Sequence, residues 1–518
     1  MPAIRSAHKV TLGIGGARRN AAVALCRNGE VIAACEQERI TRARDAGMPP
    51  EGFPREAMEA VLQIAGCTRA DVTACGFAED GIEVPPDLPG LRLPHHLAHA
   101  TAAFLTSPFR EAVVVICGQS VCPEVAVFMA DGSGIRDLGW PWQGRGFTGL
   151  YSLLTEAVGL APQKDEHRME ALARQGDGGK GQDRQAVSAL FALERDRLSI
   201  DPNLAERVAT LMSVRTSTSM SFATRQPGVA GALQAHLGDL LIEFLRGVRA
   251  QVPTANLCLA GGLFYNTNIN TRIRQSRVFD EVFIPVHPGN AGLAVGCALA
   301  AIPDGERPST GTLVSPFLGP EYPETETKAI LDNCKLSYGY ADDGELIRDA
   351  VEALRRGHLL GWFQGRMEWG PRALGARSIL ASPSAPYVLE NLNAFLKRRD
   401  PPRSYAVSIC EEDLDRWFDG PSPSALMQFE HRVKDAAAFS QIMSGPDAPI
   451  RVHTVGRHPP ALRRLLTAFG QATGLPVLVN TSFNGFHEPI VCTPRDAVRV
   501  FYGTGLDMLV AGNFVIRK

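Results

Sequence analysis

Three clusters in the last third of the chain combine cationic side chains with glycine and small polar residues. The first is residues 365–378, the second is Lys397-Arg398-Arg399-Asp400-Pro401-Pro402-Arg403, and the third is Asn480-Thr481-Ser482-Phe483-Asn484-Gly485. Guanidinium groups bind phosphate oxygens through paired hydrogen bonds, and lysine supplies a point charge. Glycine lets backbone N–H groups approach the same oxygens closely. Together the three clusters indicate a polyanion-binding pocket.

Each cluster alone has a plainer interpretation. The run Lys397–Arg399 is typical of a solvated surface, and Gly-Pro-Arg at 370–372 is typical of a turn. Their occurrence in one region with a Thr-Ser-Phe-Asn segment favours a phosphate ligand over coincidence, but spacing alone leaves both interpretations open.

A histidine pair lies in the first third of the chain. His95 and His99, in Pro94-His95-His96-Leu97-Ala98-His99, are spaced i, i+4 on a predicted helix and therefore project from one face. That spacing suits two imidazoles on one metal ion. The alternative is an incidental pair, and His96 points elsewhere on the helix.

The elements that position these residues follow from hydrophobic periodicity. Strands are predicted at 10–14, 22–26, 31–35 and 72–77, with a helix at 56–65 and a tight hairpin at Asn28-Gly29. A similar series begins with strands at 113–117 and 125–129, and helices are predicted around 186–195 and 230–250. The repeated pattern predicts a mixed α/β domain with an internal duplication over residues 1–305.

A second α/β domain is predicted after a Pro-, Gly- and Ser-rich break that begins at residue 302. We assign 306–340 to a linker and 341–518 to this domain. Its predicted helices are 345–356, 463–472 and 494–501, the last capped by Thr493, and its predicted strands include 359–362 and 477–479. In the first domain, residues 257–262 predict a buried strand that enters a glycine turn.

The overall composition is that of an ordinary globular protein. Lys and Arg number 53 and Asp and Glu 55, so the net charge of -2 gives no general attraction to nucleic acid or anionic membranes. No apolar run approaches the roughly 18 residues that span a bilayer, and no secretory segment follows the N-terminus. We expect a cytoplasmic protein whose 11 scattered cysteines are reduced.

Three stretches are specific enough to carry a resemblance. Residues 365–380, 480–484 and 506–510 resemble the NodU/CmcH family of carbamoyltransferases, and the similarity extends over nearly the whole chain. The resemblance implies a TsaD-like N-terminal domain of the duplicated ASKHA (actin and Hsp70) class. It also implies a YrdC-like C-terminal domain with the signature Lys-x-Arg and Ser-x-Asn, here Lys397/Arg399 and Ser482/Asn484.

The resemblance implies that the C-terminal domain binds carbamoyl phosphate and ATP with Mg²⁺, and forms carbamoyl-adenylate. Preorganised cations would stabilise the charge that develops on the departing pyrophosphate. We assign this chemistry to Lys397, Arg399, Arg403 and Arg372. Substrate and nucleotide binding falls to Arg377, Ser482 and Asn484, with a purely structural clamp as the alternative for Arg377.

For the N-terminal domain the resemblance implies a divalent metal on His95 and His99. The carbamoyl group would pass there to a hydroxyl or amine of a small-molecule acceptor, as in antibiotic biosynthesis. The nucleotide would contact two glycine loops, through the residues Gly261, Gly262, Asn266, Gly289 and Asn290.

Several positions depart from the family pattern. Two aspartates that ligate metal in the family are Cys117 and Asn290 here, an early His-Asp pair aligns with Arg19-Asn20, and a lysine aligns with Arg168. Cys117 could join His95 and His99 in a Cys-His₂ set with a soft preference that is compatible with zinc, or His287 could replace Asn290; iron and zinc both remain open as the metal. The alternative is that Cys117 is a small buried residue and no metal binds.

These departures leave three functional hypotheses. The first is a complete carbamoyltransferase, by default a homodimer. The second is a non-catalytic or half-catalytic subunit that supports a partner, such as a homologue that retains the aspartates. A tRNA-modifying enzyme is the least favoured, since the chain has no basic surplus.

Overall fold

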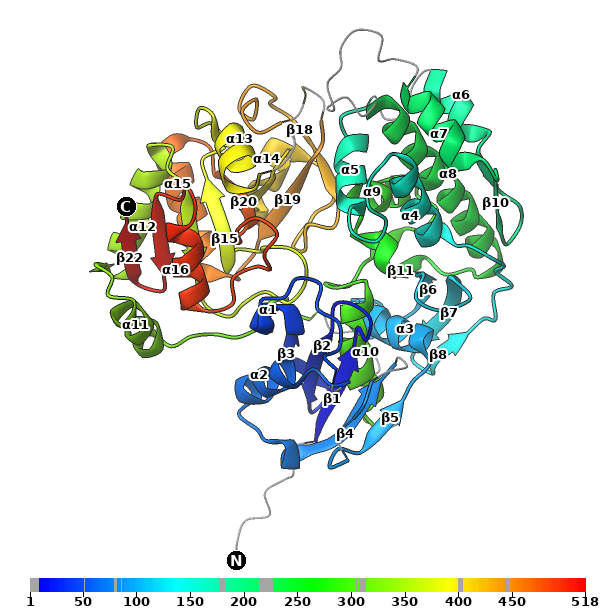
Figure 1. Ribbon diagram of the computed structural model, residues 1–518, viewed down its shortest axis with the longest axis horizontal. Helices are drawn as coiled ribbons and strands as arrows, with labels where there is room; N and C mark the ends of the chain where they lie inside the picture. The colour runs from blue at the N-terminus through cyan, green and yellow to red at the C-terminus, as the bar shows by residue number, and fades with distance from the viewer. Residues whose placement is uncertain are drawn as a thin grey trace, which may run out of the picture. The chain divides into compact units, whose positions relative to one another are not determined.

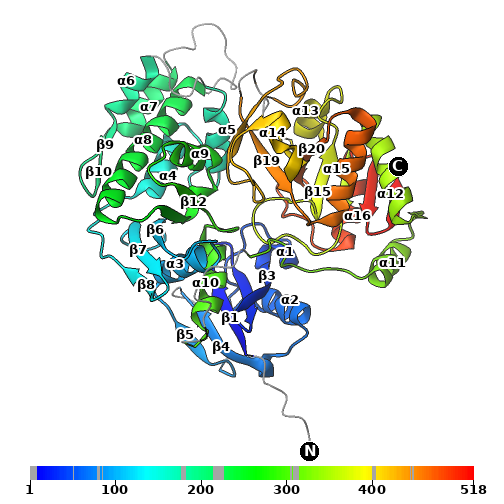
Figure 2. The same cartoon turned by 180° about the vertical axis from the view of Figure 1, so that it is seen from behind.

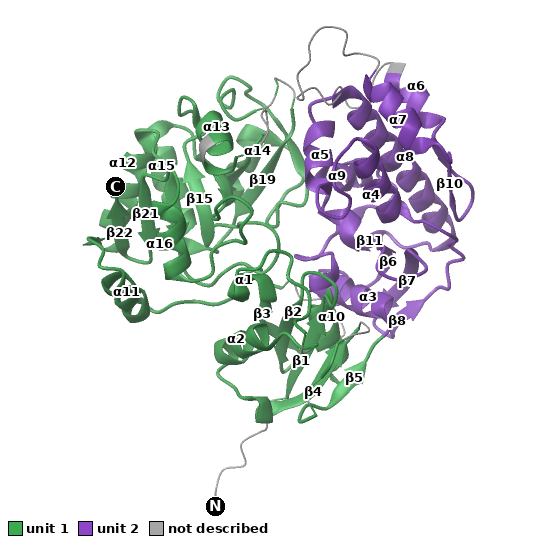
Figure 3. Ribbon diagram, in the orientation of Figure 1, with its two compact units in different colours: residues 1–93, 293–307, 314–518 green, residues 94–292, 308–313 purple. Residues whose placement is uncertain are grey.

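The computed structural model describes residues 9–50, 52–78, 82–84, 86–176, 182–213, 227–303, 306, 314–398, 404–443, 445 and 448–518. The chain forms two compact units (Figure 3). Unit 1 contains residues 1–93, 293–307 and 314–518, and unit 2 contains residues 94–292 and 308–313. No helix within the described ranges is long and apolar enough to cross a membrane.

Unit 1 begins with a five-stranded sheet of order β3-β2-β1-β4-β5. Its strands are β1 (Val10–Gly15), β2 (Ala22–Arg27), β3 (Glu30–Glu36), β4 (Val72–Phe77) and β5 (Gly90–Arg92), with helices α1 (Gln37–Thr41) and α2 (Arg55–Ala65). The predicted hairpin at Asn28-Gly29 is confirmed, since φ is 52° and 86° at these two residues. The buried side of α2 packs on β2 and β3, as its periodicity predicts.

Helix α10 (Leu293–Ala300) belongs to the same unit and packs directly on β1 (Figures 1 and 2). A Cβ at Gly13 would lie 1.9 Å from the Ala294 carbonyl oxygen. The absence of a side chain at Gly13 is therefore what lets helix and sheet approach this closely.

Unit 2 contains a second five-stranded sheet, of order β12-β11-β6-β7-β8. Its strands are β6 (Ala112–Cys117), β7 (Val125–Asp131), β8 (Gly134–Asp137), β11 (Asn256–Ala260) and β12 (Glu281–Phe283). In both sheets an antiparallel three-stranded meander is extended by two parallel strands. This shared topology confirms the α/β class and the predicted internal duplication.

The helices of unit 2 are α3 (His95–Leu105), α4 (Phe147–Ala157), α5 (Glu166–Ala173), α6 (Gln182–Ser188), α7 (Leu204–Ser213), α8 (Pro227–Gln251) and α9 (Thr267–Gln275). The helix predicted at 186–195 is wrong beyond Ser188. Residues Phe191–Leu193 form strand β9, which pairs with β10 (Leu198–Ile200) in an antiparallel ribbon. Pairing across a turn outweighs the helix propensity of this short segment, because tertiary context commonly overrides propensity.

The C-terminal part of unit 1 has a ten-stranded sheet of order β13-β22-β21-β14-β15-β20-β16-β19-β18-β17. The strands are β13 (Gly339–Tyr340), β14 (Leu360–Phe363), β15 (Arg377–Ala381), β16 (Ala406–Cys410), β17 (Phe418–Asp419), β18 (Glu430–Val433), β19 (Ile450–Val455), β20 (Val477–Ser482), β21 (Met508–Ala511) and β22 (Phe514–Arg517).

Helices cover both faces of this sheet. On one face, α12 (Asp343–Arg355) and α15 (Pro460–Thr473) pack side by side over Leu360, Trp362 and Leu478 (Figures 1 and 2). The other face is covered by α11 (Glu324–Asn333), α13 (Val388–Glu390), α14 (Leu414–Trp417) and α16 (Pro494–Tyr502). The predicted Thr493 cap is present as a capping box with Asp496.

Candidate active site

Lys397 and the turn after β20 lie together, although 85 residues separate Lys397 from Ser482. The Lys397 Nζ donates to the backbone oxygens of Ser482 (2.5 Å) and Asn484 (3.1 Å). It also donates to the Asn484 Oδ1 (2.6 Å) and lies 3.4 Å from the Ser482 Oγ. The side chain is buried, with Lys397 only 4% exposed. The fold thus assembles three residues of the predicted signature, Lys397, Ser482 and Asn484, in one place.

The turn that carries Ser482 and Asn484 is held from several directions. The Ser482 hydroxyl donates to the Asn484 Oδ1 at 2.6 Å, and the Asn484 amide donates to the Glu488 carbonyl at 2.8 Å. Between them, the fully buried Phe483 anchors the turn in the core, and its N–H donates to the Arg377 carbonyl at 3.0 Å. These hydrogen bonds hold the turn in one conformation, with its polar groups close together before a ligand binds.

Lys397 follows a π-helical turn, η4 (Asn391–Leu396). The Tyr405 hydroxyl donates to the Asn393 Oδ1 at 2.9 Å and ties this turn to the segment before β16. π-Helical turns are rare in proteins as a whole, and those that occur are frequently at functional sites. Arg399 and Arg403, the other cations assigned to this cluster, lie outside the described residues.

Arg377 has the contacts of a structural clamp. Its guanidinium donates to the carbonyls of Gln364 (3.0 Å), Gly365 (3.0 Å) and Pro320 (3.1 Å) and lies 3.6 Å from the centre of the Phe363 ring. The residue is fully buried, and burial lowers its pKa below the ordinary value, while nearby Glu368 opposes that change. This geometry favours the clamp over a direct contact with substrate. Arg372, in the same loop, is half-buried.

Glu368 organises the loop that carries Arg372. One carboxylate oxygen, Oε1, accepts from the backbone N–H groups of Leu374 (2.8 Å), Ala376 (2.8 Å) and Arg377 (3.0 Å). The residue is 2% exposed. Glu368 lies within the 365–380 stretch, and no role was predicted for it from the sequence. The sequence offered one signal for such a role: an acidic residue that lies between Arg366 and Arg372 and just before the Gly370-Pro371 turn.

The N-terminal sheet also holds this loop. The Gly370 N–H donates to the Glu36 Oε1 at 3.1 Å, and the Arg39 guanidinium donates to the Gly370 carbonyl at 3.0 Å. Glu36 and Arg39 form an ion pair of 3.4 Å with side chains only 4% and 5% exposed. These residues precede and occupy α1, and nothing in their local sequence distinguishes them from a surface i, i+3 pair. Sequence reasoning missed them for that reason.

In unit 2, helix α3 presents the predicted histidine pair on one face. The rings of His95 and His99 have centroids 4.9 Å apart and cross at 71°. His95 is 8% exposed and His99 2%. Burial, assisted by His96, lowers the pKa of His95 to about 4, and burial lowers the pKa of His99 well below its usual value. Both imidazoles are therefore neutral, which is the form that binds metal.

The described residues do not complete a metal site around this pair. Among them, no three His, Cys, Asp or Glu side chains lie close enough together to hold a metal ion. The predicted set of His95, His99 and Cys117 is therefore not assembled. Catalytic zinc sites take three protein ligands, so two neutral imidazoles do not fit that requirement by themselves.

Cys117 and His287, the two residues suggested as a third ligand, have other surroundings and partners. Cys117 ends β6 with no exposed surface, and burial raises the pKa of its thiol, so the sulfur is a protonated core group. His287 is hydrogen-bonded through Nδ1 to the Tyr265 hydroxyl. Asn290 donates from its side chain to the Ser120 Oγ at 2.8 Å and also interacts with His99.

The glycine loops are shaped by close backbone contacts. Gly261 has φ of +105°, and a Cβ there would lie 1.9 Å from the Cys117 carbonyl oxygen. Gly262 has no such neighbour, whereas a Cβ at Gly289 would meet the Tyr265 hydroxyl at 2.6 Å. Only glycine allows these approaches.

Asn266, predicted to bind nucleotide, caps α9. Its side-chain oxygen accepts from the N–H groups of Asn268 and Ile269, both at 3.1 Å, and its amide donates to the Gln234 Oε1 at 2.8 Å. The residue is 5% exposed. Its polar groups thus have structural partners in this conformation.

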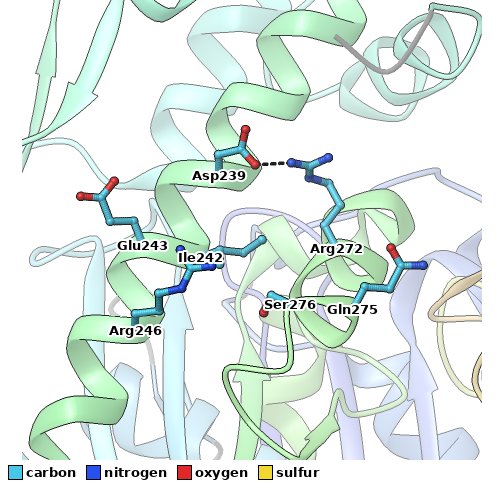
Figure 4. A pocket seen from close by; sticks show the side chains of 7 residues that line it. All are labelled: Asp239, Ile242, Glu243, Arg246, Arg272, Gln275 and Ser276. Carbon is cyan, nitrogen blue, oxygen red and sulfur yellow. Dashed lines mark hydrogen bonds and ion pairs between the residues drawn. The ribbon is translucent and has the colours of Figure 1, made fainter. Parts of the chain in front are cut away.

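A surface pocket in unit 2 lies between α8 and α9 (Figure 4). Its lining includes Asp239, Glu243, Arg246 and Arg272, and Asp239 pairs with Arg272. Charges of both signs line it, and none of the lining residues belongs to the predicted sites. We assign it no role in the chemistry.

Two family models match the chain. A model described as carbamoyltransferase N-terminus covers residues 85–299, and one described as carbamoyltransferase C-terminus covers residues 351–518. The chain belongs to the carbamoyltransferase family. The predicted resemblance is thereby confirmed, and carbamoyl transfer is the general activity of this protein.

Similar proteins include nodulation proteins. Nodulation protein NolO of Bradyrhizobium diazoefficiens is 32% identical over 440 residues, which cover 82% of this chain and 78% of that protein. Nodulation protein NolNO of Sinorhizobium fredii is 28% identical over 549 residues, covering 96% of this chain and 78% of that protein.

Similarity to solved structures is weaker. The (R)-2-hydroxyglutaryl-CoA dehydratase component A of Acidaminococcus fermentans gives a TM-score of 0.38 at 16% identity, over 57% of this chain and 97% of that one. Full-length HypF gives 0.39 at 12% identity, over 56% and 54%. Similarity at this level says nothing about activity.

Proposed function

We propose that this carbamoyltransferase forms carbamoyl-adenylate from carbamoyl phosphate and ATP in residues 341–518. The carbamoyl group then passes to a hydroxyl or amine of a small-molecule acceptor in residues 1–305. The observation that supports the first step is the buried cluster of Lys397, Ser482 and Asn484, which combines an ammonium, a hydroxyl and a carboxamide on one preorganised turn.

The chemistry balances in three steps. Water releases phosphate from carbamoyl phosphate and leaves carbamate. A carbamate oxygen attacks the α-phosphorus of ATP, the bond to the bridging oxygen of the β-phosphate breaks, and pyrophosphate leaves. An acceptor oxygen or nitrogen then attacks the carbamoyl carbon, its proton is released, and AMP departs.

The second step is where fixed cations matter most, because negative charge accumulates on the departing pyrophosphate. Lys397 supplies one positive charge, and Ser482 and Asn484 supply hydrogen-bond donors once ligand oxygens replace their present partners. Mg²⁺ bound to ATP would add further charge neutralisation. Arg399, Arg403 and Arg372 remain assigned to this cluster as predicted.

The test measures pyrophosphate release and carbamoyl-AMP by mass spectrometry, with the whole chain, ATP, Mg²⁺ and isotope-labelled carbamoyl phosphate. We expect Lys397→Ala to reduce both by about 100-fold or more, as removal of a preorganised charge-stabilising group does. Lys328→Ala is the control, because Lys328 is exposed and its ion pair, with Asp332 at 2.7 Å, lies within one helix. Full activity in Lys397→Ala would remove this residue from the mechanism.

A second candidate function is favoured by the incomplete ligand set around His95 and His99. In that case the chain forms the adenylate, and a homologue with a complete metal site performs the transfer. Metal analysis of the purified chain, with the His99→Ala variant as comparison, separates the two. Stoichiometric metal lost in the variant supports transfer by this chain, and absence of metal supports the divided arrangement.

A further inference from the structure

Three polar side chains form a buried row across the C-terminal sheet. The Asn480 Nδ2, on β20, donates to the Ser408 Oγ on β16 at 2.8 Å, and the Ser408 Oγ lies 3.0 Å from the His453 Nδ1 on β19. Asn480 and His453 are each 2% exposed, and Ser408 is fully buried. Because all three side chains are buried, a role at the protein surface does not account for this row.

The hydrogen bonds in the row have a defined direction. Burial lowers the pKa of His453 to about 3, so the imidazole is neutral and its Nδ1 can accept the Ser408 proton. The Ser408 oxygen then accepts from the Asn480 amide. The open end of the row is the Asn480 Oδ1, which is buried and accepts no hydrogen bond from the described residues.

This open carbonyl lies beside the cluster described above. Because side chains alternate along a strand, Asn480 and Ser482 share one face of β20, separated by two residues, or about 7 Å. On the same face, Ser378 of β15 is directly across the ladder from Ser482. On this face of β20, the Asn480 side chain is therefore the next one to the Ser482 side chain, whose hydroxyl belongs to the proposed phosphate site.

The loop that Glu368 organises covers this face. Its Gly375 N–H donates to the Ser378 Oγ at 3.0 Å, and its Leu374 joins an apolar cluster with Met427 and Ala406. Ala406 pairs with Asn480 in the ladder. The cover lowers the local dielectric, where a hydrogen bond is strong and an unpaired acceptor is costly.

We propose that the Asn480 Oδ1 accepts a hydrogen bond from the amide nitrogen of the carbamoyl group and makes the site selective for carbamoyl phosphate over acyl phosphates. This inference rests on the proposed formation of carbamoyl-adenylate in this part of the chain. Ser408 and His453 are positioning residues, since the Ser408 Oγ, itself in contact with His453, holds the Asn480 Nδ2 and so fixes the side-chain amide.

The chemistry of the donor explains why such an acceptor is needed. Carbamoyl phosphate and acetyl phosphate have nearly the same shape and charge, and differ in an amino group where the other has a methyl group. Cations that bind the phosphate cannot distinguish them. A buried carbonyl can, because it gains a hydrogen bond from the amino group and stays unpaired against the methyl group.

The experiment compares kcat/KM for pyrophosphate release with carbamoyl phosphate and with acetyl phosphate, at saturating ATP and Mg²⁺. In the wild-type chain we expect carbamoyl phosphate to be preferred. Asn480→Leu should lower kcat/KM for carbamoyl phosphate by about 10- to 100-fold and change that for acetyl phosphate by less than about 3-fold. The ratio of kcat/KM for carbamoyl phosphate to kcat/KM for acetyl phosphate should therefore fall.

Ser382→Ala is the matched control, since it removes a buried hydroxyl whose partner is Ser384 and which lies beyond the end of β15. The ratio should be unchanged in it. If Asn480→Leu does not accumulate as folded protein, Asn480→Ala removes the same carbonyl without adding bulk and should narrow the ratio equally.

A folded variant with the wild-type ratio would overturn the assignment of Asn480. That result differs from failure of the proposed function itself, in which the wild-type chain would release no pyrophosphate with either phosphate. The assignment would also be overturned if Asn480→Ala kept the wild-type ratio of kcat/KM for the two phosphates while Ser382→Ala lowered it. Selectivity would then lie in another part of the sheet.

Discussion

Replacement of His453 by asparagine should change how stability depends on pH. The His453 imidazole is 2% exposed, and burial lowers its pKa from the ordinary 6.5 to about 3. Asparagine can place an oxygen near the position of Nδ1 and keep the contact with Ser408, which is 3.0 Å in the native protein. His453→Asn therefore removes the titration while it retains the hydrogen bond.

The magnitude follows from proton linkage. Below pH 6.5 the unfolded chain binds a proton at His453, whereas the folded chain stays neutral down to about pH 3. Each pH unit in that window lowers the free energy of unfolding by about 1.36 kcal/mol. Between pH 7.5 and pH 4.5 the wild-type protein should lose about 2.7 kcal/mol through His453 alone.

The assay is urea unfolding at pH 7.5 and pH 4.5, followed by intrinsic tryptophan fluorescence, to which Trp362, Trp369 and Trp417 contribute from the same part of the chain as His453. The buried histidines of α3 titrate in both proteins, so they cancel in the comparison. The wild-type protein should lose about 2 to 3 kcal/mol more than His453→Asn over this range. Equal losses in the two proteins would show that the folded protein does not hold His453 neutral in this pH range.

Three further substitutions test the geometry of the site by thermal or urea unfolding. Gly261→Ala forces a Cβ against the Cys117 carbonyl and should cost about 3 kcal/mol or more, whereas Gly262→Ala, with nothing nearer than 3.9 Å, should cost less than about 1 kcal/mol. Arg39→Met removes the cation that is paired with the buried Glu36 carboxylate and should lower the free energy of unfolding by about 3–5 kcal/mol. The double variant with Glu36→Gln, which removes the negative charge as well, should recover part of that stability. Glu368→Ala leaves three backbone N–H groups without an acceptor and should cost about 3 kcal/mol, with a milder loss for Glu368→Gln, which keeps one oxygen. Wild-type stability in any of these would contradict the contact that it tests.

Sequence periodicity predicted most elements because their burial patterns are local. The strands at Val10–Gly15 and Val72–Phe77, the Asn28-Gly29 hairpin and the Thr493 cap all follow from residues close in the chain. The helix predicted over 186–195 is wrong at Phe191–Leu193 because this segment is a strand through its pairing with Leu198–Ile200, which its local pattern does not reveal.

Within the site, sequence reasoning named the residues that carry chemistry but not those that hold them. Lys397, Ser482 and Asn484 were recognisable as a spaced signature, and the structure brings them together. The partners of Gly370, which are Glu36 and Arg39, come from more than 300 residues away. No local pattern distinguishes such a contact from an ordinary surface ion pair.

The family, most of the elements and the residue types available for phosphate binding could be predicted from short, specific stretches of the chain. Which of these groups meet could be learned only from the folded protein. In the folded protein, Arg377 binds backbone carbonyls as a clamp. Among the described residues, Cys117 does not join His95 and His99 in a metal site. Asn480, Ser408 and His453 form one hydrogen-bonded row. The physical reason is that burial and strand register, which set charge state and hydrogen-bond partners, depend on contacts between distant segments.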